Sequence, residues 1–413
     1  MESSDLEFHE ITDRCKFNDI HTTKIKVSRD ASVIQVGDVP LTDSESDDNN
    51  QWTEQGTKEP KPFPTILKLI VDATQDDFFG STGDSDQNQN PSDQNQHDID
   101  KIPTMMDIIE NANRVHGINL DEKQLVAYKI ICSSFLIQIL KDQTSQCTGE
   151  LRQQHLTHIE KTMESLKQYG GKEQLIMFIT GPAGAGKTTS VKLAQKFCEE
   201  FCNSCAIPFD QYSFFFTAYT GAAASDSGGR TTLTSLKIPI FGALGDADDH
   251  TISILHSVKI LIMDEISFMT KQQLNNIDKR LQGIFNCAEP FGGMSVIFSG
   301  DFRQMEFGSV SNEQLLYTTH SKMEFENLLN AALILENKHR FKDDPEFGEM
   351  LTDMWFDDLS IEQKEKINER FVRDKSDLPK YLDDNCHYAC PTNAERNAIA
   401  MNNFIRHIEN THR

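Results

Sequence analysis

The sequence lacks the features that mark membrane-spanning and secreted proteins. It contains no run of about 18 consecutive apolar residues, so no membrane span is expected. The start, MESSDLEFHE, is acidic and has neither the basic first part and apolar centre of a signal peptide nor the Arg-rich face of a transit peptide. The nine cysteines are scattered and odd in number, which suits a reducing compartment better than a disulfide scaffold. These absences predict an intracellular protein, nuclear if its source is a eukaryote.

A cluster of basic residues is also missing. The formal net charge is −24, and residues 1–104 hold 22 acidic against 9 basic residues, so more than half of the excess lies in a quarter of the chain. Without a basic patch, the composition gives no reason to expect strong non-specific affinity for nucleic acid.

The chain divides into three regions by composition and patterning. Residues 41–60 are polar and acidic and residues 82–100 form an Asp/Gln/Asn tract, so residues 1–104 are predicted to be largely disordered. The apolar piece at 65–71 fits either a strand or a docking segment and is left unassigned. An ordered domain is predicted over 105–335, and a further region over 336–413.

Apolar runs alternate with amphipathic stretches after residue 105. Strands are predicted at 175–180, 213–216, 260–263 and 294–299. This alternation predicts an α/β fold, a parallel sheet with helices on both faces. A polar helical insertion is expected at the surface between 141 and 170. Beyond 336, helices are expected at 345–356 and 360–372, a strand at 387–390 and a last helix towards Arg413.

Residues 181–188 read GPAGAGKT, a full phosphate-binding loop motif between a predicted buried strand and a helix. The glycines let backbone N–H groups close around a phosphate chain at the positive end of the following helix. Lys187 would reach the β- and γ-phosphates and the Thr188 hydroxyl would ligate Mg²⁺. The predicted nucleotide-contacting residues of this segment are Gly181, Pro182, Ala183, Gly184, Ala185, Gly186, Lys187, Thr188 and Thr189.

An apolar strand that ends in two acids follows at residues 261–265. Asp264 could hold Mg²⁺ through water, and Glu265 could orient and deprotonate the attacking water. The alternative is a helix N-cap with two solvated acids.

Three further segments each have a structural alternative. Gln304 ends SGDFRQ after a buried strand and could contact the γ-phosphate, although such a segment is also a common turn. The small residues of TAYTGAAA at 217–224 would let a nucleic-acid strand approach, or would serve helix–sheet packing. Gln124 begins a helix and could contact an adenine edge, or be solvated.

In this order, the segments resemble those of superfamily 1B DNA helicases of the Pif-one type. The resemblance covers residues from about 118 to 400 and rests on LDEKQ, GPAGAGKTT, TAYTGAAA, GGRTTLTS, IMDEIS, FSGDFRQ and NKHRFKDDPEF. It implies a RecA-like P-loop NTPase domain at 105–335 and the beginning of a second one at 336–413. The implied function is ATP hydrolysis coupled to 5′-to-3′ translocation on single-stranded DNA and duplex unwinding, in DNA repair, recombination or telomere maintenance.

The resemblance also assigns residue roles. Gln124 would contact adenine, Gln304 would couple the γ-phosphate to movement, and Arg340 would reach the γ-phosphate from the second domain. Lys187, Thr188, Asp264 and Glu265 keep the roles given above. The residues implied to line the DNA channel are Thr217, Thr220, Gly221 and Ser235. Such motors hold a strand through backbone amides, small residues and stacking, which agrees with the absence of a basic face. A monomer is expected.

The sequence departs from the family pattern at three places. Residues 232–235 read Thr-Leu-Thr-Ser where the family usually has Thr-Leu-His-Ser, and residues 305–308 read Met-Glu-Phe-Gly where the family commonly has a Leu-Pro or Pro-Val pair. The chain ends at Arg413, before the later family motifs, so a fragment or a degenerate relative is expected. A P-loop ATPase that does not act on DNA and a non-catalytic nucleotide-binding module therefore stay open as alternatives.

Zinc is not expected. Cys198 and Cys202 lie on the apolar stripe of the helix after the phosphate loop, and they are separated by three residues, not by the two of the usual zinc-binding pair. Core packing is the predicted role of these thiols.

Overall fold

The structure is a computed structural model. It describes residues 60–74, 103–240, 243–304, 314–317, 322–336, 341, 343–369, 390 and 393–411. The chain divides into two compact units, Met1–Asp344 and Pro345–Arg413. Most of the N-terminal region predicted to be disordered lies outside the described residues. Arg340 also lies outside them, and of the strand expected at 387–390 only Cys390 is described. The predicted domain boundaries remain predictions.

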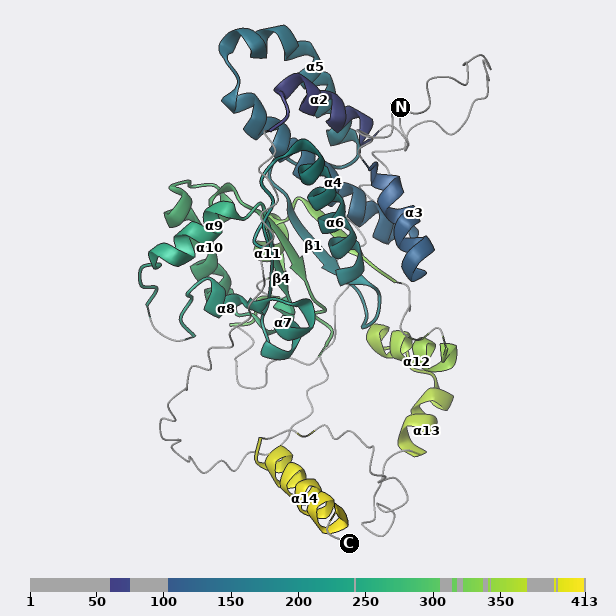
Figure 1. Ribbon diagram of the computed structural model, residues 1–413. Coiled ribbons are helices and arrows are strands. Elements are labelled where there is room, and N and C mark those ends of the chain that lie inside the picture. Colours follow the sequence, from purple (N-terminus) through teal and green to yellow (C-terminus); the bar gives the residue numbers. More distant parts are fainter. Residues whose placement is uncertain are drawn as a thin grey trace, which may run out of the picture. The chain divides into compact units, whose positions relative to one another are not determined.

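A six-stranded parallel sheet forms the centre of the first unit (Figure 1). Its strands are β1 (Ile176–Thr180), β2 (Phe214–Ala218), β3 (Arg230–Thr231), β4 (Ile260–Asp264), β5 (Ser295–Ser299) and β6 (Ala331–Ile334). They lie in the order β3-β2-β4-β5-β1-β6. The four strands expected from the sequence are β1, β2, β4 and β5, whereas the two edge strands were not anticipated.

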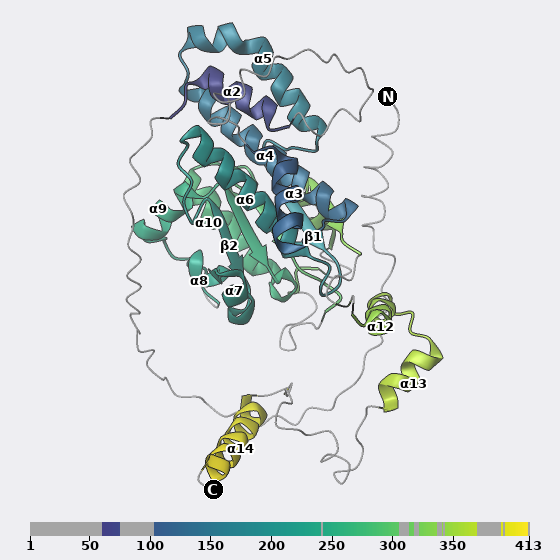
Figure 2. The ribbon, with the colours of Figure 1, turned by 45° about the vertical axis from the view of Figure 1, so that its right-hand side comes forward.

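Helices cover both faces of the sheet (Figures 1 and 2). Successive side chains of a strand point to opposite faces: Met177 and Ile179 of β1 enter one apolar core, and Ile176 and Phe178 enter the other. The first core includes α3 (Met105–His116), α4 (Glu122–Gln146) and α6 (Lys187–Cys205), and the second includes α9 (Asp249–Ser257) and α10 (Lys271–Phe285). The predicted class, an α/β P-loop NTPase fold with helices on both sides of a parallel sheet, is confirmed.

Shorter elements complete the first unit. They are α7 (Gly221–Ser227), α8 (Thr232–Ser235), the single-turn helices η2 (Ile266–Phe268) and η3 (Pro290–Gly293), and α11 (Lys322–Leu328). Several of them follow the carboxyl ends of strands, the edge at which ligands bind in sheets of this kind.

Helix α4 is long and apolar enough, by length and composition, to span a membrane. However, 72% of its most apolar stretch is buried inside the protein. Phe135, Leu136 and Leu140 are at most 1% exposed and belong to the first core. A helix surrounded by protein on most of its surface is a core helix, and this burial explains its apolar composition.

The segment left unassigned by sequence reasoning is helix α2 (Phe63–Asp72). Ile66 and Ile70, four residues apart, are fully buried on one side of it. Its entry is held by the Lys61 N–H, which donates to the carbonyl of Cys205 at 3.1 Å. In Figure 2, α2 lies beside α4 and α5 (Gly149–Gln168). This piece of the N-terminal region is therefore part of the first unit's core.

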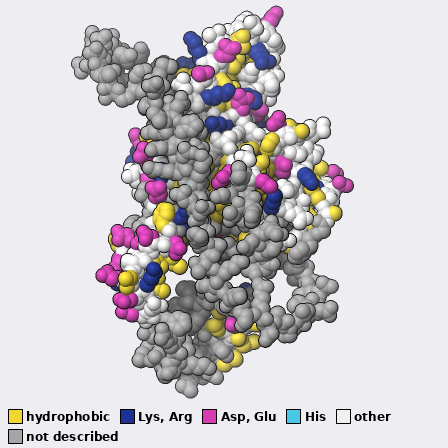
Figure 3. All heavy atoms as spheres, turned by 180° about the vertical axis from the view of Figure 1, so that it is seen from behind, with side chains coloured by type: hydrophobic (Ala, Val, Ile, Leu, Met, Phe, Trp, Pro, Cys, Tyr) yellow, Lys and Arg dark blue, Asp and Glu magenta, His cyan; other side chains and the backbone are white. Residues whose placement is uncertain are grey.

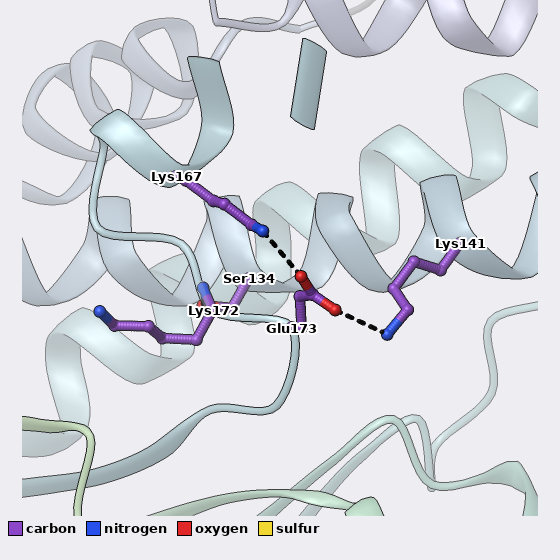
Figure 4. Close-up of polar contacts among 5 residues, drawn as sticks. All are labelled: Ser134, Lys141, Lys167, Lys172 and Glu173. Carbon is purple, nitrogen blue, oxygen red and sulfur yellow. Dashed lines mark hydrogen bonds and ion pairs between the residues drawn. The ribbon is translucent and has the colours of Figure 1, made fainter. Parts of the chain in front are cut away.

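The polar segment predicted between 141 and 170 is helix α5 and the turn before it, packed on α4 and α2 through Ile159 and Leu166. Glu173 joins the two long helices (Figure 4): it accepts from Lys167 of α5 at 2.7 Å and from Lys141 of α4 at 3.1 Å. These hydrogen bonds lower the pKa of Glu173. The N–H of Lys172 donates to the Ser134 hydroxyl at 2.9 Å, so the chain is held to α4 just before it enters β1.

The second unit contains three helices among its described residues, α12 (Pro345–Phe356), α13 (Ile361–Glu369) and α14 (Asn393–Thr411). The first two match the helices predicted at 345–356 and 360–372. An ion pair between Lys366 and Glu346 joins α13 to α12. Met354 and Phe356 of α12 are more than half exposed.

Candidate nucleotide-binding site

The phosphate loop connects β1 to α6, and its glycines occupy backbone conformations that other residues rarely adopt. Gly184 and Gly186 have φ of 83° and 79°, in the left-handed region. Gly181 has φ of 143°, and a Cβ there would lie 2.2 Å from the carbonyl oxygen of Leu335, just after β6. The loop therefore needs glycine both for its own turn and for the close approach of the neighbouring strand.

Helix α6 begins at Lys187, directly after Gly186, which offers no side chain to cap it. The helix dipole would favour an anion at this end of α6. Thr188 and Thr189 lie half-buried on the first turn, and Ala183 is exposed at the tip of the loop.

The ammonium group of Lys187 lies over the loop itself. It donates to the carbonyl of Gly181 at 2.8 Å and to that of Pro182 at 3.3 Å. A phosphate placed in the loop would offer this cation a stronger, charge-assisted partner than these carbonyls. Lys187 thus lies at the phosphate loop, and its contact with the β- and γ-phosphates remains a prediction.

Gln124 is held against the phosphate loop from α4. It is only 2% exposed, and its Nε2 donates to the carbonyl of Ala185 at 2.9 Å. Its Oε1 accepts from the N–H of Asp121 at 3.0 Å, and the Asp121 carboxylate accepts from the N–H of Gln124 at 2.8 Å, which forms a capping box. The alternative of a solvated glutamine is wrong, and contact with an adenine remains a prediction.

The two acids lie at the carboxyl end of β4. Asp264 is its last residue and accepts from the N–H of Glu265 at 2.9 Å. Glu265 has φ of 55° and ψ of 41°, a left-handed conformation that costs a non-glycine residue about 1–3 kcal/mol. It makes no side-chain cap on η2, so the alternative of a capping acid is not supported.

The pKa of Glu265 is raised above its usual value, mainly because the carboxyl group is half-buried. The negative charge of Asp264 adds to this, Lys187 opposes it, and Asp301 contributes a further upward shift. The fold thus brings the ends of β1, β4 and β5 to one place. A raised pKa makes Glu265 a stronger base for an attacking water.

Asp301 was not singled out by sequence reasoning, although the same signal, an acid directly after a buried strand, was present. It follows β5, is 2% exposed and accepts from the N–H of Arg303 at 3.0 Å. The N–H of Gln304 donates to the carbonyl of Asp301 at 3.1 Å, which closes the turn. Gln304 is half-buried there, and its contact with a γ-phosphate remains a prediction.

The residues at this site fit Mg²⁺. Thr188 and Asp264 offer hard oxygen ligands, and the charges of Asp264, Asp301 and Lys187 all act on Glu265 at this place. Among the described residues, no group of three or more His, Cys, Asp or Glu is arranged to hold a metal. Mg²⁺ at nucleotide sites usually takes one or two protein ligands, with phosphates and water completing its shell, so the two ligands suffice.

The cysteines of α6 pack in the core, as predicted. Cys198 is fully buried and Cys202 is 1% exposed. Burial raises the pKa of Cys202 to about 12 and that of Cys205 to about 11, so both are neutral thiols at physiological pH.

Two of the four predicted DNA contacts, Thr220 and Gly221, reach the surface, and the hydroxyl groups of Thr217 and Ser235 are buried. Thr217 is fully buried; its hydroxyl donates to the carbonyl of Ile262 at 2.8 Å and accepts from the Thr232 hydroxyl at 2.9 Å. The assignment of Thr217 to a channel wall is therefore corrected, because a fully buried hydroxyl that links β2 to β4 cannot contact DNA. Thr220 caps α7 through the N–H of Ala223 and Gly221 is exposed, whereas Ser235 is half-buried and its hydroxyl oxygen is enclosed by the protein.

Comparison with known proteins relates this site to one family. Residues 150–314, which include the phosphate loop, the two acids and Asp301, match the family model described as PIF1-like helicase. Over this stretch, the chain is similar to the PIF1-like helicases. The resemblance expected from the ordered motifs is confirmed.

Among curated PIF1-like relatives, the chain is 29% identical over 158 residues to the ATP-dependent DNA helicase PIF3 of Trypanosoma brucei brucei, and 34% identical over 136 residues to Pif1 of Bdellovibrio bacteriovorus. These matches cover 38% and 31% of this chain but only 18% and 28% of the two relatives. The matched stretch thus spans less than a third of each relative's length.

A Pif1 helicase from Bacteroides, solved in complex with ADP-AlF3 and single-stranded DNA, is a structural neighbour. It shares 22% identity over 58% of this chain and 55% of its own, with a TM-score of 0.42.

Proposed function

We propose that the first unit of this chain is the ATPase domain of a DNA helicase and hydrolyses ATP to move along single-stranded DNA. One observation carries the proposal: a complete phosphate loop with its lysine lies beside an Asp-Glu pair at the carboxyl edge of a parallel sheet, in a chain related to PIF1-like helicases. Both relatives described above are called ATP-dependent DNA helicases.

Each residue of the site has a defined task in this reaction. The loop amides and Lys187 hold the β- and γ-phosphates, and Glu265 accepts a proton from the water whose oxygen attacks the γ-phosphorus. The bond to the β-phosphate oxygen breaks, which releases ADP and inorganic phosphate. Bound Mg²⁺, held by Thr188 and Asp264, would neutralise charge on the phosphates.

Several finer features belong to the proposal. Translocation runs 5′ to 3′, and duplex unwinding serves DNA repair, recombination or telomere maintenance inside the cell, in the nucleus of a eukaryote. We also propose that the protein acts as a monomer. On the face in Figure 3, Lys and Arg side chains of the described residues lie among Asp and Glu, so no broad basic patch is seen there.

Phosphate release measured with and without single-stranded DNA tests the proposal. We expect DNA to raise the rate severalfold, and Lys187→Ala and Glu265→Gln to abolish it. Lys192→Ala is the matched control, because Lys192 is an exposed lysine on the same helix, and it should behave as the wild type. A rate that DNA leaves unchanged would overturn the helicase assignment in favour of an ATPase that does not act on DNA. Nucleotide binding without phosphate release would overturn the assignment as an enzyme.

A further inference from the structure

Tyr219 connects the surface proposed for DNA to the loop that carries the catalytic acids. It lies directly between the end of β2 and Thr220, which caps α7. Its backbone N–H donates to the carbonyl of Asp264 at 3.0 Å, so the two segments are joined where β2 and β4 end side by side.

The side chain of Tyr219 makes two more contacts with the segment after Asp264. Its ring stacks on Phe268, with ring centroids 6.2 Å apart and an interplanar angle of 24°. Its hydroxyl accepts from Nε2 of Gln273 at 3.3 Å. Gln273 is 6% exposed and its Oε1 accepts from the N–H of Thr270 at 2.9 Å, which fixes the orientation of the amide towards Tyr219.

Phe268 is the last residue of the single turn η2, which begins directly after Glu265, and Glu265 already has a strained left-handed backbone. Closely packed side chains transmit displacements instead of absorbing them. A shift of the Tyr219 ring would therefore move Phe268 and, through one turn of backbone, the carboxylate of Glu265. The hydroxyl groups of the two neighbouring threonines are engaged elsewhere. The Thr217 hydroxyl donates to the carbonyl of Ile262 inside the sheet, and the Thr220 hydroxyl caps α7.

We propose that Tyr219 is the positioning residue through which single-stranded DNA bound at Thr220 and Gly221 accelerates ATP hydrolysis at Glu265. This inference rests on the function proposed above and adds a residue to which that proposal gave no role.

The test compares Tyr219→Ala, Tyr219→Phe and Tyr212→Ala in the full chain. Tyr212 is the matched control: it lies before the other end of β2, packs on the same core and contacts Phe215 at 5.7 Å and 80°. For each variant, ATP turnover is measured with and without oligo-dT, and the dissociation constant for oligo-dT is measured by fluorescence anisotropy.

We expect Tyr219→Ala to lower the ratio of stimulated to unstimulated turnover by about fivefold or more, the usual range of coupling between two sites, while oligo-dT is still bound. Tyr219→Phe keeps the ring on Phe268 and should restore the ratio, and Tyr212→Ala should leave it unchanged. Phe268→Leu removes the stack from the other side and should reproduce the loss, which keeps the test decisive if Tyr219→Ala does not fold.

Three results would overturn the inference while the proposed function stands. The first is an unchanged ratio of stimulated to unstimulated turnover in both Tyr219→Ala and Phe268→Leu. The second is a lower ratio that is explained by weaker binding of oligo-dT, and the third is an equal decrease of the ratio in Tyr212→Ala. A wild-type protein that oligo-dT does not stimulate would instead overturn the proposed function itself, and the inference with it.

Discussion

Replacing Gln124 by alanine separates two roles for this glutamine. A contact with adenine, implied by the family resemblance, would make Gln124 selective for ATP over GTP. The structure shows instead that its amide is engaged on both sides, with the Asp121 N–H at 3.0 Å and the Ala185 carbonyl at 2.9 Å. We expect its main role to be to hold the phosphate loop against α4.

The size of the effect follows from the two hydrogen bonds. Loss of the bond from Asp121 costs about 0.5–1.5 kcal/mol, and a buried carbonyl of Ala185 left without a partner costs about 1–3 kcal/mol. The free energy of unfolding should therefore fall by about 1.5–4.5 kcal/mol. A loop that has lost one such support should bind nucleotide about 2- to 12-fold more weakly, which corresponds to about 0.5–1.5 kcal/mol.

Affinities for ATP and GTP, measured by calorimetry together with urea unfolding, test this reasoning. We expect Gln124→Ala to weaken both nucleotides by a similar factor. Gln273→Ala is a close control, because Gln273 is a buried glutamine in a capping box with one further hydrogen bond, but on α10. The free energy of unfolding of Gln273→Ala should fall by a similar amount, and its affinities for ATP and GTP should be unchanged. Weakened ATP binding with unchanged GTP binding would refute the loop-holding role in favour of adenine contact.

Three other substitutions test the fold and the site. Gly181→Ala should abolish nucleotide binding in a fluorescent-nucleotide titration, because its Cβ would lie 2.2 Å from the Leu335 carbonyl; retained binding would contradict the loop geometry. Ile66→Ala should lower the free energy of unfolding by about 2–5 kcal/mol in urea, against almost no change in Lys68→Ala, which is exposed on the same helix. Glu173→Gln should cost less than about 1 kcal/mol, because the side chains of Glu173 and its two lysines are about half exposed. Because the pKa of Glu173 is lowered in the folded state, its contribution to the free energy of unfolding is fully present above its unfolded pKa and is lost as the pH falls through the folded pKa. A contribution that grows on acidification would contradict this sign.

Part of the fold was predictable because its signals are local. The four central strands are apolar runs, and α12 has a clear helical period. Helix α2 was not predictable, because a short apolar stretch fits a strand as well as a helix until the surface on which it packs is known. The edge strands β3 and β6 escaped notice because two or four residues carry too little pattern.

The candidate site shows the same division. Lys187, Asp264 and Glu265 belong to contiguous motifs, and the structure brings them together as expected. Thr217 was misplaced, because a threonine at the end of a buried strand can face the solvent or bond the neighbouring strand, and the sequence does not distinguish the two. Asp301 was overlooked, because its importance depends on the adjacency of β4 and β5.

The sequence by itself determined the chemistry of the phosphate loop and the family relationship, because these reside in consecutive residues whose backbone conformations and side-chain types are specified locally. Only the tertiary structure decided which distant residues support that chemistry. Gln124 and Ala185 are separated by 61 positions, and Tyr219 and Gln273 by 54. Such pairs meet because parallel strands bring their carboxyl ends to one edge of the sheet, in an order that the chain does not follow.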